Sequence, residues 1–224
     1  MKYFLWQSSE PIAFLIYVGA FFFYARKIDG GLHYWIITIT YLFATILLTR
    51  ASIRVEGDTS NNFYYNLLYP ITSAGISYYF FTLLLARWKK IVAIISCLTT
   101  VAYYFSHLDQ EYFDSIGHVI ASTGIVLLIF LYLQQLVSYV TETPLSLNFD
   151  FWFVCVQLMY QLGSFAIFLS YNYFTQQYLV ASDGKREISV MLGDLWIVHN
   201  IILFVGAIVT AYAVVRVSKK FNTR

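Results

Sequence analysis

A few ionisable side chains lie inside long apolar stretches of this sequence, and they are the residues best suited to do chemistry. They are Asp194 and His199 in the last stretch and His118 near the start of the fifth. A charged group at the centre of a bilayer costs about 2.5 to 3.5 kcal/mol on insertion scales, so such groups usually face a protein interior or water. His199 lies deepest and is the strongest candidate for a ligand contact. Asp194 and His118 are equally compatible with the headgroup level.

Asparagines at a similar depth extend this set to a pocket. Because polar groups in hydrocarbon gather where they can be paired, we expect one polar pocket in the outer half of the bundle, open to the outer side. The residues expected to form it are His199, Asn200, Asp194, His118, Asn66 and Asn172. Glu10 and His107 are expected at the same depth or just above it.

A stripe of polar residues in the sixth apolar stretch predicts a helix face that looks into the protein. Gln157, Gln161 and Ser164 align at the helical period of about 100° per residue. Gly206 and Thr210 in the last stretch form a small-xxx-small pair that allows close helix packing. Interhelical hydrogen bonds explain any single one of these residues more readily than a ligand or transport pathway does.

The elements that must position these residues are membrane-spanning helices. Of 224 residues, 59% are hydrophobic and only 12% are charged, whereas a soluble domain normally carries roughly 25% charged residues. The apolar residues fall into stretches near the bilayer-spanning length of about 20 residues. We therefore predict an all-α, polytopic transmembrane bundle of about seven helices in one domain over residues 1–224. The expected spans are Pro11 to Ala25, Tyr34 to Thr49, Phe63 to Ala86, Ile91 to Ser106, Ile116 to Val140, Phe151 to Phe174 and Val190 to Val215.

The connections predict an orientation. One side holds about nine basic residues and the other about five, which favours the amino terminus outside and the carboxyl terminus inside. Arg50 and Arg54 count against this assignment, although Glu56 and Asp58 accompany them, and the acidic residues Asp109, Glu111 and Asp114 also fall outside. The net charge of +2 therefore reports orientation in the membrane and predicts no nucleic-acid partner.

Several catalytic chemistries fit the sequence poorly. The last stretch has no lysine for a retinal Schiff base. A zinc-dependent seven-span hydrolase needs several histidines with a carboxylate, and here His118, His199 and Asp194 are scattered, without an HxxxH pair in the last stretch or an HExxH motif. A rhomboid-like GxSx turn is absent, and we expect His118 and His199 at depths too different for the two axial ligands of one haem. We predict no metal, no other cofactor and no catalytic residue.

Two segments resemble a known group of proteins. They are DFWFVCVQLMYQLGSFAIFLSYNYF from Asp150 to Phe174 and DLWIVHNIILFVGAIVTAYAV from Asp194 to Val214. They are similar to the end of small multi-span bacterial proteins, especially of the Bacteroidota, that are often encoded beside histidine kinases, and to the seven-span sensor regions of some such kinases. The resemblance implies a sensory module in the bacterial inner membrane. With no kinase, cyclase or response-regulator domain before Arg224, we expect its output to pass to a separate cytoplasmic protein.

Two hypotheses of different class follow. The first is a module that binds a small or lipid ligand in the outer pocket, changes its helix packing and signals to a separate partner such as a histidine kinase. The second is a seven-span membrane enzyme, for example a metal-dependent hydrolase, or a small transporter. A polar pocket without a nucleophile or metal triad favours the sensor. The lipid bilayer is a partner in either case, and homo-oligomerisation stays open.

Overall fold

Seven long helices form the described part of the chain. The computed structural model describes residues 9–53, 62–107, 114–139, 144–180 and 184–221. Within these residues the structure is 92% helical and has no strand, which confirms the predicted all-α bundle. The helices are α2 (Ser9–Lys27), α3 (Leu32–Ile53), α4 (Asn62–Leu83), α5 (Arg87–Phe105), α6 (Ser115–Ser138), α7 (Phe149–Val180) and α8 (Lys185–Phe221), with a short 3-10 turn η1 (Leu145–Leu147) before α7. Arg54, Glu56, Asp58, Asp109 and Glu111 lie outside the described residues.

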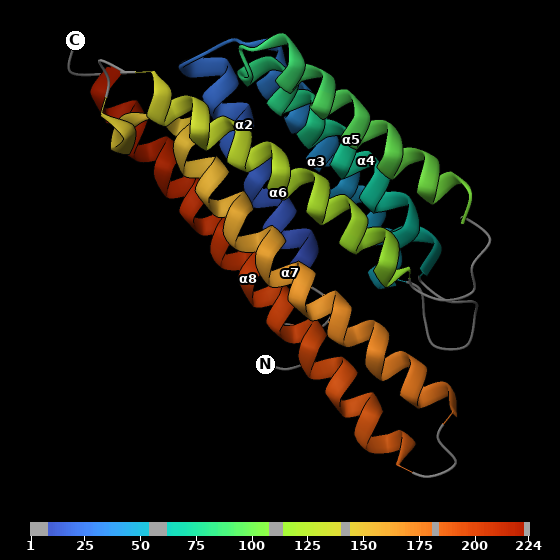
Figure 1. The fold of residues 1–224 in the computed structure, drawn as a ribbon. Helices are drawn as coiled ribbons and strands as arrows, with labels where there is room; N and C mark the ends of the chain where they lie inside the picture. Colours follow the sequence, from blue (N-terminus) through green and yellow to red (C-terminus); the bar gives the residue numbers. More distant parts are fainter. Residues whose placement is uncertain (1–8, 54–61, 108–113, 140–143, 181–183, 222–224) are drawn as a thin grey trace.

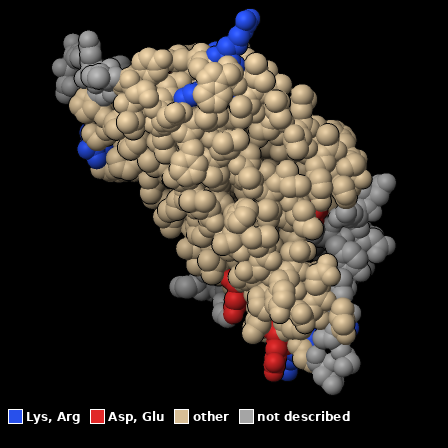
Figure 2. All heavy atoms as spheres, viewed as in Figure 1, with Lys and Arg blue, Asp and Glu red and all other residues tan. Residues whose placement is uncertain are grey.

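The surface of the bundle identifies a membrane protein. Four helices are long and apolar enough to cross a bilayer, over Leu32–Ala51, Ser115–Ser138, Phe149–Tyr178 and Lys185–Lys219. Large apolar side chains such as Phe43, Leu98 and Phe130 point outward and are about half exposed. On the face shown in Figure 2, lysine, arginine, aspartate and glutamate lie towards the two ends of the molecule, and uncharged residues fill the broad band between them. Lipid is the solvent that such a band requires.

Helices α7 and α8 are longer than the sequence predicts. Hydropathy places their spans at residues 151–174 and 190–215, but the helices contain 32 and 37 residues, or about 48 and 55 Å at 1.5 Å per residue. A hydrocarbon core is about 30 Å thick. Hydropathy marks only the part of a helix that lies in lipid, whereas helical hydrogen bonding continues into polar segments such as Gln176 and Gln177. In Figure 1 the two helices project as a hairpin beyond the other five.

Six of the helices close into a ring. Neighbouring helices contact each other in the order α2, α3, α4, α6, α7 and α8, and α8 packs back against α2. Helix α5 packs outside this ring, against α4 and α6. The ring closes tightly at Gly206 of α8. A Cβ atom there would lie 2.7 Å from the Tyr17 hydroxyl of α2 and 2.9 Å from Val156 of α7, so glycine is needed for this close approach. Because α5 packs outside this order of contacts, every long helix except α5 lines the interior of the ring.

The peripheral helix α5 is tied to the ring by side chains that bond to backbone groups. The Leu85 N–H donates to Oε1 of Gln135 on α6 (2.8 Å), and Gln135 Nε2 donates to the Leu83 carbonyl (3.0 Å). Lys89 Nζ donates to the Leu131 carbonyl of α6 (2.9 Å). The two bonds of Gln135 satisfy a carbonyl and an amide at the turn between α4 and α5, where helical bonding is interrupted, and the bond of Lys89 ties the first turn of α5 to α6.

Candidate functional site

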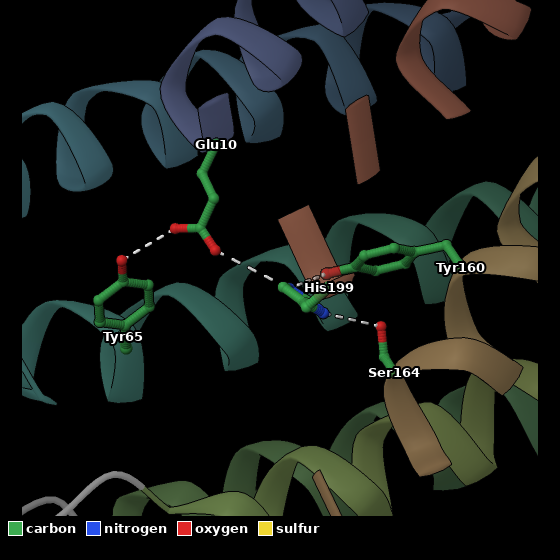
Figure 3. A network of polar contacts seen from close by, with 5 residues as sticks. All are labelled: Glu10, Tyr65, Tyr160, Ser164 and His199. Carbon is green, nitrogen blue, oxygen red and sulfur yellow. Dashed lines mark hydrogen bonds and ion pairs between the residues drawn. The ribbon is translucent and has the colours of Figure 1, made fainter. Parts of the chain in front are cut away.

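His199 is the centre of a buried polar network inside the ring. Its side chain, on α8, is 2% exposed. Its Nδ1 lies 3.2 Å from the Ser164 hydroxyl, and its Nε2 lies 3.4 Å from the Tyr160 hydroxyl; both of these residues are on α7. Figure 3 shows the imidazole between these hydroxyls and the carboxylate of Glu10. Both ring nitrogens of His199 therefore face polar groups, one on each side.

Glu10 supplies the acidic group of this network. It lies in the first turn of α2 and is 5% exposed. Its Oε2 accepts a hydrogen bond from the Tyr65 hydroxyl of α4 (2.9 Å), and its Oε1 lies 3.8 Å from His199 Nε2. A carboxylate in the first turn of a helix is also favoured by the helix dipole. We call Glu10, Tyr65, Tyr160, Ser164 and His199 the His199 network; it joins α2, α4, α7 and α8.

Aromatic rings enclose the His199 network. The centroid of the His199 ring lies 5.0 Å from that of Phe168 and 5.6 Å from that of Trp196. Trp196 in turn packs edge-on against Tyr65 at 5.1 Å. These rings lower the local dielectric around the carboxylate and the imidazole, which strengthens the electrostatic interaction between them.

His118 on α6 lies beside the network and not at another depth. It is 3% exposed, its ring centroid is 6.2 Å from that of His199, and neither of its ring nitrogens has a hydrogen-bond partner among the described residues. The expected difference in depth between His118 and His199 was therefore wrong. Phe168 packs against both rings, at 3.9 and 5.0 Å, so an aromatic side chain fills the space where a haem would have to lie.

No group of three His, Cys, Asp or Glu residues that could hold a metal occurs within the described residues.

A small cavity continues from His118 towards the middle of the ring. Its volume is about 30 Å³, which is room for about two water molecules. Its polar walls are formed by Ser73, His118, Ser122, Gln157, Tyr160 and Gln161. The hydroxyls of Ser73 and Ser122 have no partner among the described residues, like both nitrogens of His118. Because buried polar groups are normally hydrogen-bonded, these unpaired atoms suit a polar occupant.

The predicted polar stripe of α7 faces this interior. Gln157 and Gln161 are each 3% exposed and Ser164 is fully buried. Gln157 Nε2 donates to the Tyr41 hydroxyl of α3 (3.1 Å), and Gln161 Nε2 donates to Gln157 Oε1 (3.4 Å). Ser164 belongs to the His199 network, and Gln161, about one turn before it on α7, lines the cavity. The stripe therefore connects the network with the cavity.

The other predicted pocket residues differ in how deeply the structure buries them. Asn200 is fully buried, and Asn66 is 1% exposed, with its Oδ1 accepting a bond from the Asp114 N–H (3.3 Å) at the start of α6. Asn172 is half-buried on α7, about two turns beyond Ser164. Asp194 differs most from expectation, because it is exposed. It lies five residues from His199, which turns it about 140° around α8 to the opposite face.

Sequence reasoning missed the acidic and phenolic partners. Glu10 was expected at this depth but not as the partner of His199, and Tyr65 and Tyr160 were counted only as apolar residues. A signal was present for Glu10, because it is an acidic residue directly before the first predicted span, Pro11 to Ala25. The sequence contains no such signal for a tyrosine hydroxyl, since the ring fits an apolar pattern whether or not the hydroxyl is hydrogen-bonded.

A second polar cluster lies at the opposite end of the ring. Asp150, in the first turn of α7, accepts hydrogen bonds at Oδ1 from the Tyr34 hydroxyl of α3 (2.8 Å) and the Tyr79 hydroxyl of α4 (2.5 Å). His33 packs against both of these tyrosine rings, at 4.0 and 5.7 Å. We call Asp150, Tyr34, Tyr79 and His33 the Asp150 cluster. In the sequence analysis Asp150 appears only as the first residue of a segment that carries the resemblance.

Comparison with known proteins adds no relative: no protein-family model, no curated protein and no solved structure matches this chain.

Proposed function

We propose that this chain is a sensory module of a bacterial inner membrane. A small polar ligand in the cavity beside the His199 network changes the packing of the helices, and a separate cytoplasmic protein reads the change. The observation that carries the proposal is that one buried network joins α2, α4, α7 and α8 around a single side chain, His199. Any change in its hydrogen bonding acts on four helices at once.

Helix α8 gives this network a route to the other end of the bundle. It runs without interruption from Lys185 to Phe221 and carries His199 in its first half and the basic residues Arg216 and Lys219 near its end. A continuous helix moves largely as one body, so a tilt or shift imposed at His199 reaches its carboxyl-terminal end. That end, together with Arg87 and Lys90, is the surface we propose for a separate partner such as a histidine kinase.

The cavity favours a small polar ligand over a lipid. A space of about 30 Å³ has no room for an acyl chain, and its walls offer hydroxyl, amide and imidazole groups. Apolar grooves do occur outside the ring, for example one of about 240 Å³ between α4 and α5 that is lined by Ala74, Phe81 and Leu98. Those grooves suit the surrounding lipid, whereas the interior suits hydrogen-bonding solutes.

The proposed orientation places the His199 network on the outer side. At the end where α8 terminates, the charged residues visible in Figure 2 are basic, whereas the acidic residues visible there lie towards the other end, beside further basic residues. Basic residues favour the cytoplasmic side. The ligand would then come from outside, and the carboxyl-terminal end of α8 would lie in the cytoplasm.

The test measures whether the His199 network controls the far end of α8. Spin labels at Lys27 of α2 and Lys219 of α8, both exposed, report the separation of these helix ends in nanodiscs after Cys97 and Cys155 are replaced. His199→Leu is expected to shift this distance by about 2 Å, the scale of helix shifts in known switches. Thr210→Val is the matched control, because Thr210 is fully buried on the same helix but lies outside the His199 network, and its hydroxyl donates to the Gly206 carbonyl (2.9 Å). Equal distances in the two variants would refute the coupling.

One observation favours an enzyme as the second candidate. Ser164, His199 and Glu10 stand in the order hydroxyl, imidazole, carboxylate, with contacts of 3.2 and 3.8 Å, which is the arrangement that activates a serine nucleophile. Ser164, however, is fully buried and is not among the residues that line the cavity. A fluorophosphonate probe decides between the two: labelling that is lost in Ser164→Ala would establish a serine enzyme, and an unlabelled chain is expected for the sensor.

A further inference from the structure

Polar groups follow the axis of the ring from one end to the other. Helix α7 provides the scale, with Ser164 in the His199 network, Gln161 and Gln157 at the cavity, and Asp150 at the far end. This series covers about 21 Å at 1.5 Å per residue, which is much of the thickness of a hydrocarbon core. Ionisable groups stand at both ends, as Glu10, His199 and His118 on one side and Asp150 and His33 on the other.

A single aromatic layer interrupts this series. Phe21 of α2 and Phe153 of α7 are fully buried, and their ring centroids lie 4.8 Å apart. On one side, Tyr41 packs against Phe21 at 5.9 Å and holds the Gln157 amide through its hydroxyl. On the other side, Tyr79 packs against Phe153 at 5.1 Å and bonds to Asp150. The two polar halves are therefore separated by the Phe21–Phe153 contact, with the buried ring of Phe149 packed against Phe21 on the Asp150 side (5.2 Å).

Structural hydrogen bonding alone does not account for this arrangement. Bonds that only hold helices together satisfy their donors and acceptors, but His118, Ser73 and Ser122 leave polar atoms unpaired around a cavity with room for about two water molecules. Water in that cavity would link His118 to Gln161, Gln157 and Tyr41. Chains of this kind, which alternate side chains and water between ionisable groups inside a membrane, are the chemistry of proton relays.

We propose that the axis of the ring is a gated proton path. A proton taken up at Glu10 or His199 passes through the hydrated cavity to Tyr41 and, when the Phe21–Phe153 contact opens, to Asp150, from which it leaves at the other end. Each step transfers one proton from an oxygen or nitrogen to the next, so only O–H and N–H bonds form and break. The driving force is the proton gradient. An apolar constriction that excludes water holds such a path closed.

The path ends at the surface at its Asp150 side. Asp150 is half-buried, and Lys27 at the end of α2 and Asp29 in the turn that follows it are exposed. At the other side, Glu10 lies in the first turn of α2. This activity does not depend on the proposed sensory function, because proton passage requires only the axial groups and the gate, not a partner at the end of α8.

The test uses the full chain in liposomes that contain a pH-sensitive dye, with proton entry driven by a potassium gradient and valinomycin. Phe153→Ala and Phe21→Ala each remove half of the gate and are expected to raise the rate of proton entry on the order of tenfold over the wild type. The matched control is Phe80→Ala, because Phe80 is also fully buried and aromatic and packs against Tyr132 and its neighbour Tyr79, but its ring contacts neither Phe21 nor Phe153. Adding Asp150→Asn to either gate variant is expected to lower the rate to that of the wild type or below it.

Each outcome decides the proposal. Gate variants that match Phe80→Ala, or a raised rate that Asp150→Asn leaves unchanged, would show unspecific leakage and overturn it. Two gate variants on different helices are used so that a folding failure of one leaves the other. If neither folds, the wild type is compared with Asp150→Asn: slower proton entry in the variant supports the path, and equal rates overturn it. The spin-label distances that test the sensory function do not enter this comparison.

Discussion

Glu10 and His199, from the first and last helices of the structure, meet inside the ring with a carboxylate oxygen 3.8 Å from an imidazole nitrogen. They are the one carboxylate and the one imidazole of the His199 network, whose other members, Tyr65, Tyr160 and Ser164, contribute hydroxyl groups. A carboxylate and an imidazole that share a dry site depend on each other more than surface charges do.

Removing the phenol that supports Glu10 is expected to destabilise the protein. Tyr65→Phe keeps the ring that packs against Trp196 but leaves Glu10 Oε2 without its donor, which should lower the free energy of unfolding by about 1 to 3 kcal/mol. Tyr173→Phe is the control, because Tyr173 is 60% exposed, and should change stability little. Unfolding in mixed micelles measures both variants, and equal stabilities would contradict the importance of this bond.

The serine beside His199 is expected to matter more than a serine elsewhere on the same helix. Ser164→Ala removes the hydroxyl that faces His199 Nδ1 and should cost about 0.5 to 1.5 kcal/mol. Ser170→Ala removes a hydroxyl that donates only to the Ala166 carbonyl of its own helix at the surface, so its effect should be near zero. Thermal unfolding of the two single variants checks the difference.

The two tyrosines of the Asp150 cluster are expected to be energetically coupled. Tyr34 and Tyr79 donate to the same oxygen, Asp150 Oδ1, so losing one phenol leaves the other to satisfy the carboxylate. Tyr34→Phe and Tyr79→Phe should each be tolerated better than their combination, with a coupling energy of about 0.5 to 3 kcal/mol in a double-mutant cycle. Strictly additive effects would show that the two bonds are independent.

The orientation predicts which side of the membrane each turn faces. A cysteine at Lys185, in the first turn of α8, should react with an impermeant maleimide in intact spheroplasts, whereas a cysteine at Arg87, at the start of α5, should react only after lysis; both positions are exposed. A carboxyl-terminal alkaline phosphatase fusion should be inactive. The reverse labelling pattern or a strongly active fusion would place the amino terminus inside.

The sequence predicts the seven helices and one inward face well, because both follow from local patterns. Hydropathy finds each apolar stretch, and the 100° period places Gln157, Gln161 and Ser164 on the interior side of α7. The expectation for Asp194 rested on its depth and not on its angular position. Asp194 is five residues from His199, so the 100° period places it about 140° away on α8. The local pattern fails for the ends of α7 and α8, where the helix outlasts its apolar segment.

Partners across the ring could not be predicted from spacing. The contact between Glu10 and His199 depends on α8 returning to pack against α2, and periodicity within one helix contains no information on which helices are neighbours. The relative depth of His118 and His199 depends on helix tilt and on the offset between α6 and α8, which apolar length does not fix.

The contact between α2 and α8 also sets the order in which the protein can be assembled. During synthesis α2 is the first of the seven helices to enter the membrane and α8 is the last, so the ring stays open until α8 has been made. Until α8 arrives, Glu10 lacks His199, and the Gly206 surface that receives Tyr17 does not yet exist. A nascent chain without α8 thus carries an unmatched acidic group, a feature by which membrane quality-control proteases distinguish copies that lack α8 from copies with a closed ring.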